Sequence, residues 1–491
     1  MQRTLISLLL AAASAIATAG LAAAGELEDV VALALRDNPQ VAAAREAVLR
    51  TEAGRLGLRG FYAPQATAAS GWNRAGRSVP GVPGEVVLPD DAASFLAGVE
   101  TAVRPGAYIG VGAGERYLIQ PEGFGDYLYQ PVAGVQVRIP LLKDRGFRQW
   151  KEQNAGADAE YNAAVGRLLR ICQDLQRDVE DRYFQHMRSR SDLDIARAAT
   201  ARAQSLLTEA DQLVELKMLP PHQLYPARLE LALRQEEETA AVSAAETSRR
   251  RVRELAGAVA LAADRTQTVD LVTWAGASEL PKPPDGFLMR RGVYLEGMAA
   301  AAAAEAALRQ AVDTERSDLS LRTVYTWQGE DESNPFGTEP LLTDSRSGVE
   351  VSLVWKRALG SRSERARIEA ARAQVRELRE SLRSIEWRIA AERDVAAQDF
   401  GAASARLKLM SAAVQDARDA LGAEEERFRL GDGTSRQVLD AQKDLTAAIR
   451  RQNDIAADVL RVRSVYLYAV GLTGAAGAGG GENGRSKPLP P

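Results

Sequence analysis

The sequence predicts a mainly α-helical protein with some β structure, built from two tandem repeats of short helices, a β-hairpin and a long coiled-coil helical hairpin. Three observations carry this prediction: a helical pattern of unusual length, a second copy of the arrangement at a fixed distance along the chain, and short segments of alternating polarity in each copy. Together they predict a trimer in which a β-barrel of about 12 strands continues into an α-barrel of about 12 helices.

The longest helical pattern runs from Ser363 to Leu430, and the segment from Arg436 to Gly471 returns alongside it. Its apolar residues recur in steps of three and four, which is the seam of a coiled coil, and only Glu392 and Glu424 interrupt it. At about 1.5 Å per residue this helix is roughly 100 Å long, so it must pack against other long helices. The seam residues are Ile368, Ala371, Val375, Leu378, Leu382, Ile385, Ile389, Ala396, Phe400, Ala403, Leu407, Met410, Val414, Ala417, Leu421 and Phe428.

The same construction occurs earlier in the chain, displaced by 214 positions. The matched segments are Gly134–Ile139 with Gly348–Leu353, Leu216 with Leu430, Ala227 with Ala441, Leu231 with Leu445, and Gly257 with Gly471. Because the displacement is the same at both ends, no net insertion separates the copies across two long helices. We interpret this pattern as a tandem duplication whose helix lengths are fixed by a shared tube height. Chance similarity of alanine-rich helices is the alternative.

The two copies and their flanks give a set of expected boundaries. These are 1–24 for a signal peptide; 25–62 for the first short helices, 63–140 for the first β-hairpin with a long outer loop, and 141–258 for the first long helical hairpin; 259–285 for a linker; 286–316 for the second short helices, 317–356 for the second β-hairpin, and 357–471 for the second long helical hairpin; and 472–491 for a disordered tail rich in glycine and proline.

The composition excludes several classes of function. The 491 residues carry a net charge of −4, and no basic face of the density needed for nucleic acid stands out, so we expect no nucleic-acid partner. Cys172 is the only cysteine, and His186 and His222 are the only histidines, which argues against a disulfide framework and a metal site. The sequence has no phosphate-binding glycine loop and no nucleophile with a nearby base. We therefore expect no cofactor and no enzyme activity.

The N-terminus has the pattern of a secretory signal. Arg3 precedes an apolar run from Leu5 to Ala19, and Ala22–Ala24 supply the small residues of a cleavage site near Ala24. A short uncleaved anchor is the alternative. Beyond residue 25 no uncharged apolar run approaches the roughly 18 residues of a spanning helix. If the mature chain enters a membrane, we expect it to do so as strands.

Strand patterns follow each group of short helices. Leu319–Trp327 and Val349–Leu353 in the second copy, and Ala66–Trp72 and Val135–Ile139 in the first, alternate between apolar and polar residues. A strand between lipid and water requires this period of two, although a half-buried strand of a soluble protein shows it too.

Aromatic residues lie near the ends of these strands. Trp72, Tyr325 and Trp327 fit the aromatic girdle found at membrane interfaces, and packing inside a soluble protein is the alternative.

The loops between the paired strands differ in length. The first, at about 75–133, accounts for a 40-residue change in the displacement between the copies, and the second covers about 329–347. The first loop also has the pattern of an extra hairpin, Phe95–Val103 and Tyr108–Tyr117, turning at Arg104–Gly106. Both loops are expected on the outer side of the membrane, and the pairing of the extra hairpin is left open.

Two hairpins per chain impose assembly. Four strands cannot close a barrel, because the smallest membrane barrels use about eight, and an open edge in hydrocarbon leaves backbone groups unpaired at several kcal/mol each. Three chains would supply about twelve strands and about twelve helices, with approximate sixfold symmetry from the duplication. A helical tube joined to a membrane pore would conduct solutes.

Several short motifs, taken in order, resemble the TolC-like outer-membrane efflux protein family. They are Leu27, Ala34–Leu35, Asn38–Pro39 and Val41; Pro140–Leu142 leading into a long helix; and Arg427–Gly431 through Val438–Gln442. The resemblance covers the mature chain up to about Gly471 and depends on order, duplication and spacing. It implies a homotrimeric channel-tunnel, with a β-barrel in the lipid of the Gram-negative outer membrane and an α-helical barrel through the periplasm. Its helix tips would meet a periplasmic adaptor, which is a membrane fusion protein, and an inner-membrane pump.

The resemblance places the gate at the two helical turns, of which the second matches the family better. Asp440 matches an acidic pore position of the family, so three copies would form a negative ring, although an ordinary exposed acid is the alternative. Phe428 and Gln437 are the other gate candidates, and Gln437 stands where the family can carry an acid. The adaptor-contacting tip would comprise Gly431, Asp432, Gly433, Thr434 and Ser435. Thr434 or Ser435 can cap the returning helix.

The first turn departs further from the family. Pro220 and Pro221 replace the usual glycine, and Pro226, at the position that matches Asp440, is expected to kink or delay the following helix. Met218 and Leu219 would be exposed apolar residues at this tip, which predicts an adaptor contact.

These observations favour a passive conduit of a tripartite efflux or type I secretion system, gated by opening of the periplasmic tips. The alternative is a periplasmic coiled-coil adaptor or scaffold without a pore. An adaptor would carry one helical hairpin flanked by glycine-rich β domains, and a scaffold would leave the strands, aromatics and signal unexplained. The cargo is not encoded in any feature of the sequence.

Overall fold

The computed structural model of the chain describes residues 23–78, 87–104, 106–119, 127–215, 220–257, 270–330, 346–357, 362–429 and 434–473, with 341, 343 and 360. The chain divides into two compact units. The helical unit comprises residues 1–49, 162–298 and 381–491, and the sheet unit comprises residues 50–161 and 299–380. The predictions of a signal peptide and a disordered tail fall almost entirely outside the described residues.

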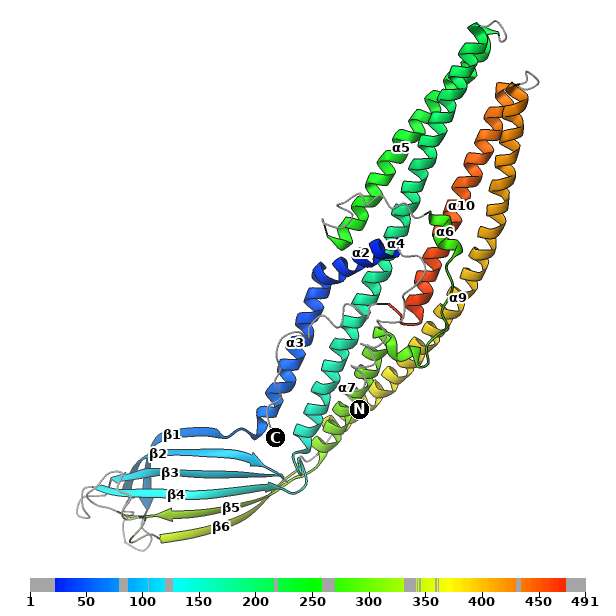
Figure 1. Cartoon of the computed structure of the whole chain (residues 1–491). Helices are drawn as coiled ribbons and strands as arrows, with labels where there is room; N and C mark the ends of the chain where they lie inside the picture. The colour runs from blue at the N-terminus through cyan, green and yellow to red at the C-terminus, as the bar shows by residue number, and fades with distance from the viewer. Residues whose placement is uncertain are drawn as a thin grey trace. The chain divides into compact units, whose positions relative to one another are not determined.

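The sheet unit contains one antiparallel sheet of six strands in the order β1-β2-β3-β4-β5-β6 (Figure 1). The strands are β1 Gln65–Ser78, β2 Val87–Val103, β3 Ala107–Ile119, β4 Tyr127–Pro140, β5 Asp318–Gln328 and β6 Arg346–Lys356. Among the described residues β1 pairs only with β2, and β6 only with β5, so the sheet is open at both edges. Each open edge presents unpaired backbone donors and acceptors.

The number of strands corrects the sequence analysis. The second copy contributes the expected hairpin, β5 and β6, but the first contributes four strands, because the extra hairpin β2–β3 lies in the sheet between β1 and β4. The expectation of four strands per chain is therefore corrected to six, and 12 strands no longer follow from three chains. The alternation of apolar and polar residues is weak in β2 and β3, because small residues interrupt it. Among them are Ala97, Gly98, Gly110, Gly112 and Gly114.

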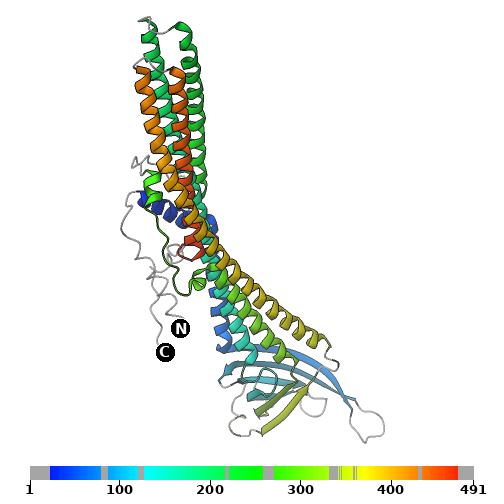
Figure 2. The same cartoon turned by 90° about the vertical axis from the view of Figure 1, so that its right-hand side faces the viewer.

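The two long helical hairpins confirm the duplication. Helix α4, Arg148–Glu215, and helix α9, Arg362–Arg429, each contain 68 residues, and both their starts and their ends are 214 positions apart. Helix α5, Leu224–Ala256, runs back along α4, and helix α10, Ser435–Ala469, runs back along α9, in both views (Figure 2). Gly257 and Gly471 end these returning helices with left-handed φ angles of 90° and 69°.

Short helices precede each sheet segment, as predicted. Helix α2, Ala23–Asp37, is followed by α3, Pro39–Arg59, and the Asn38 side chain caps α3 by accepting the Gln40 N–H at 2.8 Å. Pro39 at the first helical position needs no donor there. The second copy begins with the 3₁₀ turn η4, Phe287–Arg290, and helix α7, Gly292–Glu315.

Helix α7 packs closely against α4, which explains its small residues. A Cβ atom on Gly292 would lie 2.2 Å from the Arg170 nitrogen, and one on Gly166 would lie 2.7 Å from the Glu296 nitrogen. Both distances are shorter than any van der Waals contact, so only glycine fits. Buried Gln173 fixes the same contact by accepting the Gly292 N–H at 3.0 Å.

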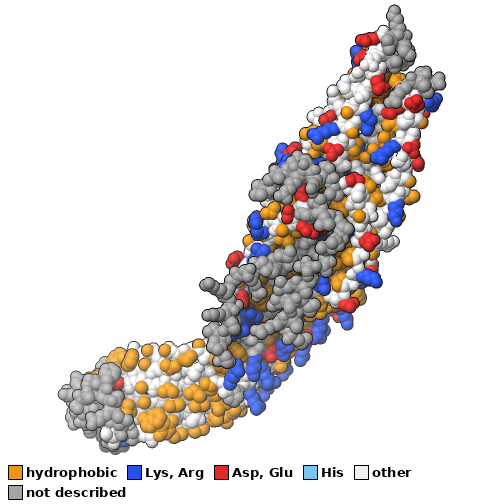
Figure 3. Space-filling model, in the orientation of Figure 1, with side chains coloured by type: hydrophobic (Ala, Val, Ile, Leu, Met, Phe, Trp, Pro, Cys, Tyr) orange, Lys and Arg blue, Asp and Glu red, His pale blue; other side chains and the backbone are white. Residues whose placement is uncertain are grey.

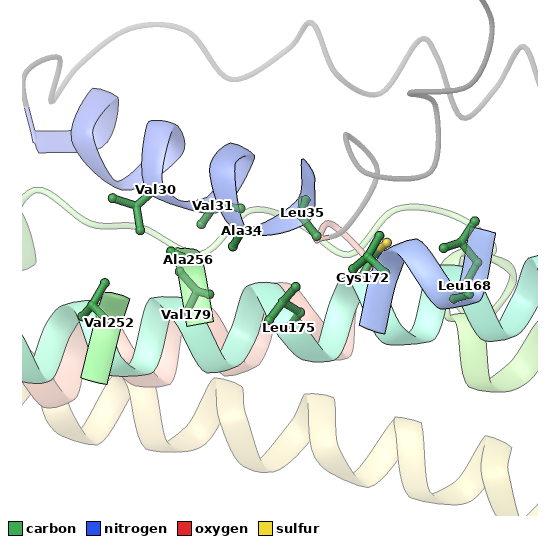
Figure 4. Close-up of a cluster of buried hydrophobic side chains, with 12 residues drawn as sticks. Val30, Val31, Ala34, Leu35, Leu168, Cys172, Leu175, Val179, Val252 and Ala256 are labelled. Carbon is green, nitrogen blue, oxygen red and sulfur yellow. The ribbon is translucent and has the colours of Figure 1, made fainter. Parts of the chain in front are cut away.

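One buried cluster of the helical unit lies between α2, α3, α4 and α5 (Figure 4). Its buried side chains are Val30, Val31, Ala34, Leu35, Val41, Ala44, Leu168, Cys172, Leu175, Val179, Val252 and Ala256. Burial raises the pKa of the Cys172 thiol to about 11, so this side chain stays protonated at neutral pH and acts as a small apolar residue.

The α9 seam is buried as predicted, but it contains a shift of four residues. The buried positions are spaced by seven residues, or once by fourteen, in two series, which are Ile368, Val375, Ile389, Ala396 and Ala403, and then Leu407, Val414, Leu421 and Phe428. Such a four-residue stutter locally unwinds a coiled coil. Glu392, which interrupts the seam, accepts a hydrogen bond at 3.2 Å from the buried Arg291 guanidinium. Glu424 pairs with Arg427 at 3.0 Å.

Ile389 tests how much the seam contributes to stability, since its side chain is fully buried. We expect Ile389→Ala to lower the free energy of unfolding by about 2–5 kcal/mol, because it removes buried methyl groups and leaves a cavity. The exposed Gln398→Ala is the control and should change it by less than about 0.5 kcal/mol. Denaturant unfolding followed by circular dichroism measures both. Equal changes in the free energy of unfolding in Ile389→Ala and Gln398→Ala would contradict the burial of the seam.

Candidate functional site

The strand register places one continuous apolar face on the sheet. Apolar residues predominate in its rows, and Thr101, Glu115, Thr323 and Ser347 are polar exceptions. The apolar members are Ala66, Ala68, Ala97, Val99, Ile109, Val111, Ala133, Val135, Val137, Ile139, Leu319, Leu321, Tyr325, Trp327, Val349, Val351, Leu353 and Trp355. We call this set the apolar sheet face. Val349, Val351 and Leu353 are 66%, 65% and 64% exposed, and hydrophobic side chains cover this part of the molecule (Figure 3). An exposed apolar patch of this extent marks an interaction surface.

Aromatic residues mark both ends of this face. Trp327 pairs across the strands with Ser347, and its ring meets that of Tyr325 edge to face at 4.3 Å. Trp72 is 66% exposed on the same face, so it is not a core packing residue. Trp355, 61% exposed at the helix end of β6, was missed because the alternating pattern was followed only to Leu353.

The opposite face of the sheet carries glycines and charged groups. A Cβ atom on Gly98 would lie 2.9 Å from the Val111 carbonyl oxygen, so the strands approach too closely there for any side chain. Nearby, the Arg138 guanidinium lies 3.9 Å from the Glu100 carboxylate and 4.2 Å from the centre of the Tyr108 ring. The sheet therefore separates an apolar face from a polar face.

The turn of the extra hairpin is anchored at the helix end of the sheet. Gly106 has a φ angle of 130°, and a Cβ atom there would lie 2.5 Å from the Cα atom of Gly146, in the segment between β4 and α4. The Tyr108 ring contacts the Phe147 ring edge to face at 5.0 Å. These contacts hold β2–β3 as a fixed part of the sheet unit.

The second helical tip combines a built cap with an exposed acid. Thr434 and Gln437 form a capping box: the Thr434 hydroxyl accepts the Gln437 N–H, and the Gln437 side chain accepts the Thr434 N–H at 2.8 Å. Phe428 is buried in one cluster with Val438. Asp440 is exposed one turn further along α10.

The structure thus buries Phe428 inside the hairpin and places Gln437 in the capping box. Asp440, the third gate candidate, is exposed and belongs to neither feature. Gly431, Asp432 and Gly433 lie outside the described residues, and Ser435 is the first residue of α10.

The first helical tip ends α4 at Glu215, and Met218 and Leu219 lie outside the described residues. The 3₁₀ turn η3, Pro221–Gln223, precedes α5, which begins three residues later than the 214-residue displacement from Ser435 would place it. The predicted delay is therefore confirmed. Pro226 lies in the first turn of α5, where no N–H needs an intrahelical partner.

An exposed apolar stripe follows this tip on α5. Tyr225, Leu229 and Leu233 are 68%, 63% and 50% exposed and lie four residues apart, so they share one helix face. This stripe was not predicted from the sequence, although its four-residue spacing is visible there.

The described residues show no grouping of His, Cys, Asp or Glu that could hold a metal ion. The two histidines lie apart, and the His186 ring is hydrogen-bonded to Ser248 at 3.0 Å. Across the described ranges, no helix has both the length and the apolar character that spanning a bilayer demands.

Comparison with solved structures identifies the fold. OprN, an outer-membrane channel, is 18% identical with a TM-score of 0.64, and the match covers 92% of this chain and 91% of that chain. CusC is 14% identical with a TM-score of 0.66 over 93% and 95%, and the open MtrE outer-membrane channel of Neisseria gonorrhoeae is 13% identical with a TM-score of 0.64 over 91% and 90%. The chain has the fold of these channels, as the family resemblance implied. No protein-family model and no curated protein sequence matches it.

The capping box predicts the local stability of the second tip. Thr434→Ala should destabilise the start of α10 by about 0.5–2 kcal/mol, because the Gln437 N–H loses its acceptor. Hydrogen exchange of amides in the first two turns of α10 should quicken accordingly. Thr434→Ser retains the hydroxyl and is the matched control. Unchanged protection in Thr434→Ala would show that the cap does not hold the tip.

Proposed function

We propose that this chain forms the outer-membrane channel-tunnel of a tripartite export system in a Gram-negative bacterium. The observation that carries the proposal is the combination of an exposed apolar sheet face, two open sheet edges and two long helical hairpins of equal length, in a fold shared with outer-membrane channels. The apolar sheet face would contact lipid, with Trp72, Tyr325, Trp327 and Trp355 at the interfaces. The helices would extend into the periplasm as a passive conduit.

Assembly follows from the open edges. In hydrocarbon every unpaired backbone group costs several kcal/mol, so β1 of one copy must pair with β6 of the next until the ring closes. We propose a homotrimer, in which six strands per chain would give about eighteen strands and two hairpins per chain would give about twelve helices. Because barrel diameter grows roughly in proportion to strand number, this barrel would be about half as wide again as one of about twelve strands.

The extra hairpin fits this barrel without disturbing its polarity. In the register Ala66 pairs with Val99, Val99 with Val111, and Val111 with Val135, so all four lie in one row of the apolar sheet face. Two added strands also keep β1 antiparallel to β4. Removing them would therefore let Ala66 pair directly with Val135 on the same face.

Deletion of residues Val87–Ile119 tests the strand count. We expect the shortened chain to remain trimeric by native mass spectrometry, and to form a ring of about twelve strands where the full chain forms about eighteen, as counted in electron-microscopy maps of both. Gly106→Ala in the full-length chain is the control. It disturbs the contact with Gly146 but keeps all six strands, so this variant should form the larger ring at lower stability. A full-length ring with two chains, or one of equal width in both proteins, would contradict the proposed barrel.

The periplasmic tips would form the gate and the partner contact. Asp440 is exposed, so three copies could form a negative ring that favours cations, while the capped Gln437 and buried Phe428 would hold the hairpin that carries it. The tip residues 431–435, with Met218 and Leu219 of the first tip, would meet a periplasmic adaptor. The adaptor and an inner-membrane pump of an efflux or type I secretion system would then select the cargo.

Asp440→Asn tests the ring. In planar bilayers with a KCl gradient, we expect the variant to lose at least about half of the wild-type cation-to-anion permeability ratio, because about three charges leave the narrowest part of the path. Asp416→Asn removes an equally exposed charge from α9 and should leave the ratio unchanged. Conducting channels with the same ratio in all three proteins would remove the gate assignment but not the channel.

A further inference from the structure

The first turns of α9 carry a dense cluster of cations beside the sheet. Residues 356–379 contain eight Lys or Arg and three Glu, a local net charge of +5 in a chain whose total is −4. The cations are Lys356, Arg357, Arg362, Arg365, Arg367, Arg372, Arg376 and Arg379, and we call them the basic segment. Lys and Arg side chains gather next to the hydrophobic surface of the sheet (Figure 3).

Most of the basic segment shares one helix face. Five arginines follow each other in steps of three, seven, four and three residues, which places them within about a third of the helix circumference: Arg362, Arg365, Arg372, Arg376 and Arg379. All five are exposed. The buried seam residues Ile368 and Val375 lie beside this face, so the cations border the helix packing and remain exposed.

Acidic neighbours neutralise only part of this charge. Arg365 lies 3.9 Å from Glu315, Arg372 2.6 Å from Glu369, and Arg379 2.7 Å from Glu305. The three arginine side chains remain 77%, 52% and 63% exposed, so their outer N–H groups can still bind another anion.

The order of residues along the chain matches the layers of a bilayer surface. Val351 and Leu353 belong to the apolar sheet face, exposed Trp355 follows at its helix end, and Lys356 and Arg357 come next. A protein at the surface of a leaflet with anionic headgroups presents apolar residues to the hydrocarbon, an aromatic residue to the interface and cations to the headgroups. These residues follow the same order. Only five residues separate β6 from α9, so Arg362 and Arg365 lie near the same level.

We infer that the basic segment binds the phosphate headgroups of anionic phospholipids in the leaflet at the helix end of the sheet. This inference rests on the proposed membrane insertion. Arginine favours such a site because its planar guanidinium forms paired hydrogen bonds with phosphate oxygens. The bound lipids would fix the depth of the barrel at its periplasmic side.

Lipid binding by the full chain tests the inference. Native mass spectrometry of the purified protein would compare phosphatidylglycerol with phosphatidylcholine of identical acyl chains. We expect the wild type to bind phosphatidylglycerol at least about tenfold more tightly, and high salt to abolish the preference. A variant with Arg357→Gln, Arg362→Gln, Arg365→Gln and Arg372→Gln should lose it, by about fivefold per cation that contacts the headgroups.

A matched variant separates the site from total charge. Arg406→Gln, Arg418→Gln, Arg436→Gln and Arg451→Gln remove four exposed arginines from the distal parts of α9 and α10 and should leave the preference intact. Equal loss in both variants, or no preference in the wild type, would overturn the inference. Dissociation of the assembly in the first variant with its lipid preference retained would also overturn it, by assigning the segment to contacts between copies. Failure of the wild type to enter phosphatidylcholine nanodiscs would instead refute the proposed function.

Discussion

The unpaired backbone at the two sheet edges is the constraint on which the rest of this structure depends. β1 has 14 residues and β6 has 11, and each exposes one row of donors and acceptors. In hydrocarbon each unpaired group would cost several kcal/mol, which is more than the about 0–1 kcal/mol that an exposed ion pair on the helices contributes. A sheet with one apolar face and open edges is stable in a membrane only as part of a closed ring.

The same constraint explains why the two copies differ in their strands and agree in their helices. A pair of added strands preserves the antiparallel order and the facing of every row, so β2 and β3 enter the sheet without reversing either face. An insertion in α4 alone would make it longer than α9. Their equal length of 68 residues, and the glycines that end α5 and α10 at matched positions, show that this register has been kept.

The sequence predicted the elements whose signals are local. The α9 period and the Thr434 cap each depend on residues within a few turns, and the structure contains both. The full sheet could not be counted, because small residues in β2 and β3 hide the alternation and their place is fixed by pairing with distant strands. The basic segment was not predicted from the sequence, because glutamates lie between its cations. At the second tip, the sequence predicted that Phe428 belongs to the buried seam, but not that it packs against Val438 of the returning helix, because that contact depends on the path of the turn.

The second tip can move only in certain ways. Phe428 and Val438 lie in one buried cluster with Leu421, and the capping box fixes the start of α10, so separating the two helices at the tip would expose apolar area and break the cap. Burying side chains of this size contributes about 1.5–3 kcal/mol each, which favours keeping the hairpin intact. The four-residue shift in the α9 seam, between Ala403 and Leu407, is the kind of insertion that locally unwinds a coiled coil. Moving the distal hairpin as one body would therefore cost less than separating α9 from α10 at the tip, because the Phe428 cluster and the cap would persist.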